Sequence, residues 1–126
     1  THYYACDIYS DILSFIRLFF DHFSQPIQVD LCDLTDFILP EPVQVALLLK
    51  TIPCLEHLDR DIGRKLITSL PAEHIIVSFP AHSLGGRSKG MPATYETRFI
   101  EMVSGTGWQV ERHLFKTELV FVLHRS

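Results

Sequence analysis

The chain has 126 residues, of which 47% are hydrophobic and 21% are charged, so it is long enough for one soluble domain with a sizeable core. Its formal net charge of −4 argues against attraction of nucleic acid over the whole surface, so any contact with RNA must be local. Polar and charged side chains interrupt the longest apolar stretch, residues 8–23, which excludes a membrane span and favours a buried helix. No export signal opens the chain, and we therefore expect a cytoplasmic location.

The cysteines and histidines are scattered along the chain. Cys6, Cys32 and Cys54 are far apart and lack the close C-x-x-C spacing of a zinc site or a redox motif, so we expect reduced thiols in the core. The histidines form no helical i, i+4 pair with a carboxylate ligand nearby. The sequence therefore predicts no metal site.

The first half of the chain alternates extended and helical patterns. A short apolar run, residues 3–6, precedes the helical repeat of residues 8–23. Residues 27–31 resume an extended pattern after a proline. Residues 43–49 are an unbroken apolar run, which is typical of a strand covered on both faces by helices.

The pattern of the second half predicts two further helices and three strands. It also contains a loop with several glycines over residues 81–92, which we expect to be mobile. The helical patterns cover residues 55–70 and 93–103, and the extended patterns cover residues 74–79, 108–113 and 119–124. The last two strands are close enough to pair antiparallel. The whole order predicts one α/β domain with a mostly parallel sheet and an antiparallel pair at its edge.

Polar residues follow several of the predicted strands. Ligands of open α/β sheets bind beyond the carboxyl ends of the strands, so Asp7, Asp33, Lys50 and the loop after Pro80 should gather on one rim. Asp7 could accept hydrogen bonds from both ribose hydroxyls of a nucleotide, or it could cap the helix that follows. Asp33 could accept from an adenine amino group, or it could be a turn residue facing solvent.

Residues 77–91, with the sequence VSFPAHSLGGRSKGM, closely resemble a loop of the 16S ribosomal RNA guanine-N7 methyltransferases that confer aminoglycoside resistance. The resemblance extends over nearly the whole chain, through residues 5–8, 49–56 and 116–120. It implies the class I, Rossmann-like sheet of S-adenosylmethionine-dependent methyltransferases, which ends in an antiparallel hairpin.

Aligned on that family, residues 1–126 are the carboxy-terminal portion of a single methyltransferase domain. The first strand, its Gly-rich turn and the amino-terminal RNA-binding extension are absent from this sequence. The resemblance places the absent strand between the strands that start near Tyr3 and Val43.

The resemblance implies S-adenosylmethionine as the cofactor. It assigns the cofactor contacts to residues at the ends of the first two strands, namely Asp7, Ile8, Asp33 and Leu34. The two acids would bind the ribose and the adenine amino group, and the apolar side chains would pack on the adenine ring.

The resemblance also implies a partner, 16S rRNA within the small ribosomal subunit. It places Lys50 and Glu56 beside the target base as catalytic residues, whereas the alternative is a surface lysine and a first-turn glutamate favoured by the helix dipole. Arg87 and Lys89 suit contacts with RNA phosphates, although a solvated loop would also explain them. Guanine N7 has an exposed lone pair, so the transfer needs positioning and electrostatics rather than a general base.

We therefore expect a cytoplasmic methyltransferase of 16S rRNA that is a monomer when complete, without a metal. Two other classes of function remain open. One is a non-catalytic RNA-binding or structural module. The other is a nicotinamide-dependent Rossmann oxidoreductase, which could also use Asp7 for ribose but which the terminal hairpin disfavours.

Overall fold

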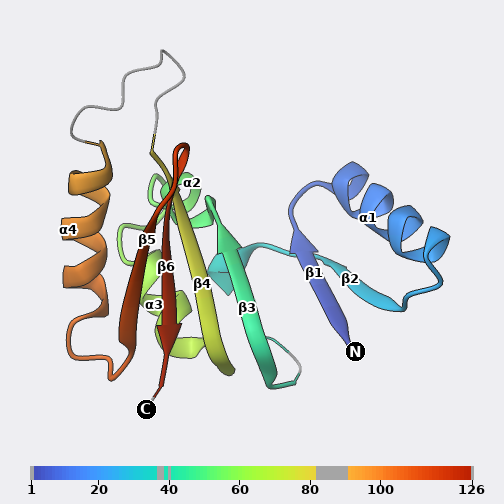
Figure 1. The fold of residues 1–126 in the computed structure, drawn as a ribbon. Helices are drawn as coiled ribbons and strands as arrows, with labels where there is room; N and C mark the ends of the chain where they lie inside the picture. The colour runs from blue at the N-terminus through green and yellow to red at the C-terminus, as the bar shows by residue number, and fades with distance from the viewer. Residues whose placement is uncertain (1, 37–38, 40, 82–90, 126) are drawn as a thin grey trace. The chain divides into compact units, whose positions relative to one another are not determined.

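A computed structural model describes residues 2–36, 39, 41–81 and 91–125, and the side chains of all of these except 91–93. The chain divides into two compact units, Thr1–Ile38 and Leu39–Ser126, here called the first and the second unit (Figure 1). Each unit has its own sheet. None of the helices in the described parts of the chain is long and apolar enough to cross a membrane.

The first unit is a strand–helix–strand motif followed by a short 3-10 helix. Strand β1 (Tyr3–Asp7) and strand β2 (Ile27–Leu31) pair in parallel, with Tyr3 opposite Ile27 and Asp7 opposite Leu31. Helix α1 (Ser10–His22) connects them, and the 3-10 helix η1 (Leu34–Asp36) follows β2. These bounds agree closely with the extended and helical patterns of the sequence.

Helix α1 is not the buried helix that its apolar sequence predicts. Among the described residues of the first unit, only Leu13 is buried. Phe15, Phe19 and Phe23 are between 52% and 68% exposed. A helix packed on two strands can bury only a narrow stripe, so the rest of its apolar surface stays open in this unit.

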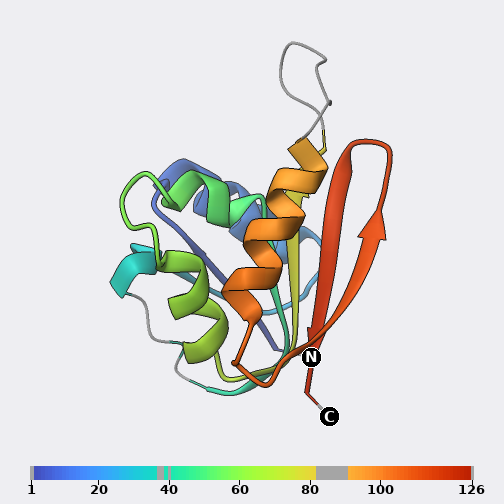
Figure 2. The same ribbon diagram turned by 90° about the vertical axis from the view of Figure 1, so that its left-hand side faces the viewer.

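The second unit holds a four-stranded mixed sheet with strand order β3-β4-β6-β5. Strands β3 and β4 are parallel, while β4, β6 and β5 pair antiparallel, as predicted for the end of the chain. Its elements are β3 (Val43–Leu49), α2 (Thr51–Leu55), α3 (Ile62–Ser69), β4 (Ala72–Pro80), α4 (Met91–Val103), β5 (Gln109–Leu114) and β6 (Glu118–His124). Helices α2, α3 and α4 cover one face of this sheet (Figures 1 and 2).

The core of the second unit lies between that face and the helices. Val77 and Phe121 are register partners on β4 and β6 and have no exposed surface. The ring of Phe121 stacks on that of Phe99 from α4, with 4.4 Å between the centroids. The side chain of Met102 on α4 packs against Gly63 of α3, in space that a Cβ atom at residue 63 would occupy.

The helix predicted over residues 55–70 begins later, at Ile62, because residues 56–61 are not helical and separate α3 from the short helix α2. The chain leaves the helix after Leu55, and Asp59 accepts a hydrogen bond from the backbone N–H of Asp61 at 2.9 Å. Such a local side-chain bond favours a turn over a continued helix. As a result Leu58, which fits the helical stripe in the sequence, is 74% exposed.

Strand β3 is also less covered than its apolar run predicts. Leu48 faces the helices and is buried, but Val45, Leu47 and Leu49 are 50–60% exposed on the other face. The strand is at the edge of the four-stranded sheet, and only one of its faces is covered in the second unit. An unbroken apolar strand therefore does not require two covered faces within the same compact unit.

Candidate active site

The two acids predicted to bind the cofactor lie side by side in the first unit. Asp7 is the last residue of β1, and Asp33 follows the end of β2, its parallel neighbour. The backbone N–H of Cys32 donates to the carbonyl of Asp7 at 3.0 Å, which holds the two strand ends together. Both acids therefore lie at the carboxyl edge, where ligands of parallel sheets bind.

Each acid also makes a local hydrogen bond, which for Asp33 is the kind that its alternative as a turn residue expects, whereas Asp7 does not cap α1, because the N-cap residue is Tyr9. Asp7 Oδ1 accepts from the backbone N–H of Tyr9 at 2.9 Å, and Tyr9 is the N-cap residue of α1. Asp33 Oδ1 accepts from both the N–H and the hydroxyl of Thr35, at 2.9 and 2.8 Å. One oxygen of each carboxylate is thus used to order the turn that presents it.

The Thr35 backbone N–H, and after it the Thr35 hydroxyl, lower the pKa of the Asp33 carboxyl below its ordinary value. Asp33 is therefore ionised at neutral pH, and both of its oxygens can accept hydrogen bonds. Near the two acids in sequence, Ile8 is 60% exposed and Leu34 is half-buried, so both offer apolar surface for a ring. The assignment of these four residues to a cofactor stays a prediction.

Cys6 and Cys32 are paired in a disulfide immediately before the two acids. This corrects the expectation of reduced core thiols for these two residues. Their Cα atoms are 6.0 Å apart because parallel pairing brings the ends of β1 and β2 together, although the cysteines are 26 residues apart in sequence. Cys54 is free, but it is exposed on α2 rather than in the core.

Lys50 follows β3 in the second unit and has a left-handed backbone, with φ of 54°. Its backbone N–H donates to the carbonyl of Ser78 at 3.0 Å and to the Ser78 hydroxyl at 3.1 Å. Its ammonium lies 3.0 Å from a carboxylate oxygen of Glu118. Because Lys50 and the two acids belong to different units, their gathering on one rim stays a prediction.

Glu56 is placed differently from the prediction of a residue in the first turn of a helix. It is the C-cap of α2, so the helix dipole does not favour its charge there. Its carboxylate forms an ion pair with the guanidinium of Arg98 on α4. Glu56 is therefore part of a contact between two helices, and its role beside a target base stays a prediction.

Three residues of this region were missed in the sequence: Ser78, Arg98 and Glu118. Ser78 is a fully buried polar residue at the end of β4. Glu118 begins β6 and is opposite Pro80 in the antiparallel register. Glu118 lies within the segment 116–120 that carries the resemblance, but only the strand pairing reveals that it meets Lys50.

Arg87 and Lys89 lie outside the described residues, so their predicted RNA contacts stay a prediction. Within the described ranges, no group of three or more His, Cys, Asp and Glu side chains is arranged to hold a metal ion.

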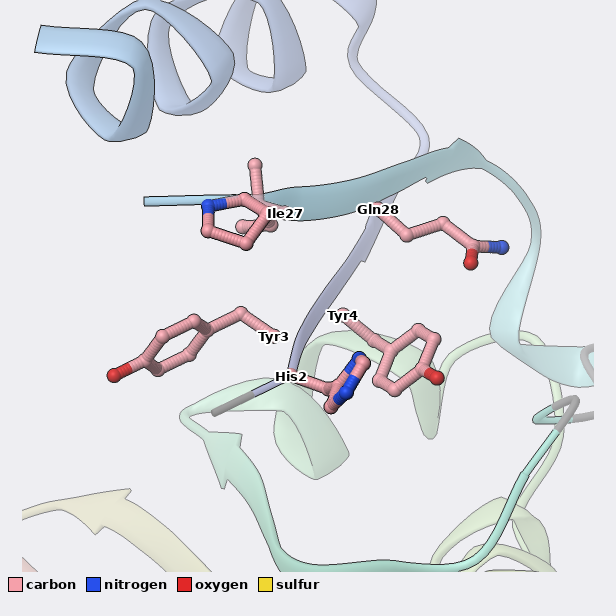
Figure 3. Close-up of a pocket in the computed structure, with 6 residues that line it drawn as sticks. His2, Tyr3, Tyr4, Ile27 and Gln28 are labelled. Atoms are coloured by element: carbon pink, nitrogen blue, oxygen red, sulfur yellow. The ribbon is translucent and has the colours of Figure 1, made fainter. Parts of the chain in front are cut away.

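A hollow of about 240 Å³ lies at the other end of β1 and β2 (Figure 3). It is lined by His2, Tyr3, Tyr4, Pro26, Ile27 and Gln28. These residues are at or next to the amino ends of the two parallel strands, whereas Asp7 and Asp33 are at the carboxyl ends. The hollow is thus separate from the expected cofactor site.

The fold is that of known S-adenosylmethionine-dependent methyltransferases. The chain superimposes on the solved structure of the 16S rRNA methyltransferase RmtF in complex with S-adenosyl-L-homocysteine, with a TM-score of 0.88 and 28% identity, over 98% of this chain and 47% of that one. The magnesium protoporphyrin IX methyltransferase of Synechocystis shares the fold at 16% identity, with a TM-score of 0.70 over 98% of this chain and 63% of that one.

The sequence comparisons identify the family. Residues 1–122 match the family model described as ribosomal RNA methyltransferase (FmrO). The chain is 35% identical over 125 residues to the 16S rRNA (guanine(1405)-N(7))-methyltransferase of Micromonospora rosea, covering 99% of this chain and 46% of that protein. It is 34% identical over 126 residues to that of Frankia casuarinae, covering 99% and 44%.

The chain therefore belongs to the FmrO family of ribosomal RNA methyltransferases. It spans a little under half the length of these two relatives.

Proposed function

We propose that this chain is the carboxy-terminal part of an enzyme that transfers a methyl group from S-adenosylmethionine to N7 of a guanine in 16S rRNA of the small ribosomal subunit, giving aminoglycoside resistance. The observation that carries the proposal is the placement of Asp7 and Asp33 at the adjacent carboxyl ends of two parallel strands, in a chain of this family. The proposed enzyme acts as a monomer in the cytoplasm, where ribosomes are assembled.

The proposed cofactor supplies an electrophilic methyl group on a sulfonium. Asp7 accepts hydrogen bonds from the ribose hydroxyls through the oxygen that does not bind Tyr9, and Asp33 accepts from the adenine amino group. Ile8 and Leu34 pack on the ring. These contacts fix the direction of the methyl group, and positioning is the main requirement for an attack by a nitrogen that already has a free lone pair.

The second unit supplies the contacts with the target in this proposal. Lys50 and Glu56 flank the guanine, and Arg87 and Lys89 bind RNA phosphates. The ammonium of Lys50 is suited to contact with the guanine, because the side chain is 54% exposed and can donate hydrogen bonds to a base edge. The proposed complete enzyme also needs the strand and Gly-rich turn that the resemblance places before this chain.

Calorimetric titration with S-adenosylmethionine tests the cofactor assignment. For these experiments this chain is fused to the amino-terminal half of the Micromonospora rosea relative. We call this fusion protein the complete enzyme. The complete enzyme should bind the cofactor, and the 126-residue chain alone should bind it weakly or not at all. Asp7→Ala should weaken binding about tenfold or more, as expected for loss of charge-assisted hydrogen bonds.

Asp21→Ala is the matched control, because Asp21 is an exposed acid in the last turn of α1, away from the carboxyl ends of β1 and β2. It should leave the affinity unchanged. Tight binding by the 126-residue chain alone would mean that the missing half is not part of the cofactor site. If the complete enzyme is folded and binds RNA but not the cofactor, the non-catalytic RNA-binding module becomes the better account.

A further inference from the structure

The residue proposed to lie beside the target base has a backbone that is held from two sides. Lys50 adopts a left-handed conformation, which is uncommon for a residue with a side chain and persists only where the surroundings enforce it. Here the carbonyl and the hydroxyl of Ser78 both accept from its N–H. Ser78 is fully buried, so it is a fixed point for the end of β3.

The side chain of Lys50 is held by a second residue that also contacts Ser78. The Glu118 carboxylate lies 3.0 Å from the Lys50 ammonium. The hydrogen bond from Lys50, and more weakly one from the Ser78 hydroxyl, lower the pKa of Glu118 below its ordinary value. Glu118 is therefore a carboxylate at neutral pH, and Ser78 connects the backbone of Lys50 to the partner of its side chain.

Glu118 itself is fixed by the strand pairing. It is opposite Pro80 in the β4–β6 register, and its carbonyl accepts from the N–H of Phe115 at 2.8 Å across the β5–β6 turn. Helix α2 and this turn lie at the same end of the sheet (Figure 1). A lysine side chain is long and flexible, so a fixed carboxylate that restricts it reduces the entropy lost when a substrate is bound.

We propose that Glu118 is a positioning residue for methyl transfer, which holds the Lys50 ammonium at the end of β3 so that its remaining hydrogens can reach the target base. This inference rests on the proposed function of Lys50. Glu118 does not touch the base and acts through Lys50. The pair is partly exposed, with 54% and 33% of the two side chains accessible, so it contributes little to folding and its loss should not unfold the chain.

A double-mutant cycle in the complete enzyme tests the inference. The rate of methyl transfer to small ribosomal subunits is measured for the wild type, Glu118→Gln, Lys50→Ala and the double variant, with thermal unfolding to confirm folding. Glu118→Gln should lower kcat roughly fivefold, the size expected of a partly exposed ion pair, with an unchanged KM for the subunit. In the Lys50→Ala background the same substitution should have almost no effect.

Glu111→Gln is the control, since Glu111 is an exposed acid on β5 that pairs with His113. It should leave kcat and KM unchanged, and Glu118→Asp should restore part of the rate lost in Glu118→Gln. If Glu118→Gln has no effect, or lowers the rate equally with and without Lys50, the positioning role is wrong although the proposed function stands. If the wild-type enzyme transfers no methyl group, the proposed function fails and the inference fails with it.

Discussion

The two units of this chain bury their apolar residues to very different extents. In the second unit three helices cover one face of a four-stranded sheet, and Ile52, Val77 and Phe121 have no exposed surface. In the first unit one helix meets two strands, and Leu13 is the only buried residue among those described. The same α/β pattern in sequence thus gives a closed core in one unit and an open one in the other.

This difference shows that an apolar sequence predicts which surfaces are to be buried, but not which element buries them. Phe15, Phe19 and Phe23 of α1, and Val45, Leu47 and Leu49 of β3, are exposed in their own units. Exposed apolar side chains at this density mark surfaces that another element covers. In our proposal the central strand that the resemblance places between β1 and β3 is one such covering element, and β3 is an edge strand of its own sheet.

The largest expected effect is on the core of the second unit. Phe121→Ala removes a fully buried ring that stacks on Phe99, and it should lower the free energy of unfolding by about 3–5 kcal/mol. Phe15→Ala removes an equally large ring that is 68% exposed, and it should change stability by less than about 0.5 kcal/mol. Urea denaturation of the 126-residue chain measures both, and equal losses would contradict the contrast between the units.

A smaller effect is expected in the first unit from the disulfide between Cys6 and Cys32. Closing a loop across 26 residues stabilises a fold by roughly 3 kcal/mol. Reduction should therefore speed hydrogen exchange of the amides of β1 and β2 and leave β4 and β6 unchanged. Cys54→Ser is the control, and it should behave like the wild type in both states. Faster exchange in β4 after reduction would show that the two units do not unfold separately.

The next prediction separates cofactor contacts in the first unit from RNA contacts in the second. In the complete enzyme, changing Arg87 and Lys89 together to Ala should weaken binding to the small ribosomal subunit and lower the slope of log affinity against log salt by about 2. The affinity for S-adenosylmethionine should be nearly unchanged. Asp7→Ala should show the reverse, and Lys50→Ala should lower methyl transfer more than subunit binding. If the double variant lost cofactor affinity and kept subunit binding, the assignment of residues 81–92 to RNA would be wrong.

The smallest effect is a pH dependence in the second unit. The pKa of Glu118 is below its ordinary value of 4.5, so its ion pair stabilises the fold above that pH, and the contribution is lost as the pH falls through the lowered pKa. Between about pH 6 and about pH 3.5, the wild type should therefore lose more stability than Glu118→Gln, by less than about 1 kcal/mol. Urea denaturation at the two pH values measures the difference, and parallel losses would mean that the pair contributes nothing.

The order and type of the elements could be predicted because each has a clear period in the sequence. The strand ends at Asp7 and Asp33 were found in this way, and so was the final hairpin. The late start of the predicted 55–70 helix could not be found, because the local hydrogen bonds of Asp59 in the preceding turn leave no mark on the apolar period. The contacts of Lys50 with Ser78 and Glu118 depend on strand register, 28 residues and more along the chain, which no local pattern contains. The pairing of Cys6 with Cys32 was missed for the same reason.

The central claim is that this chain belongs to an enzyme that methylates guanine N7 in 16S rRNA. The most direct measurement incubates the complete enzyme with small ribosomal subunits and S-adenosylmethionine that carries a labelled methyl group, then identifies the labelled nucleoside of the 16S rRNA by mass spectrometry. We predict that the label is found in 7-methylguanosine and that it falls about tenfold or more when Asp7 is changed to Ala at a low cofactor concentration. Label in another nucleoside, or no label from a folded enzyme that binds the cofactor, would contradict the claim.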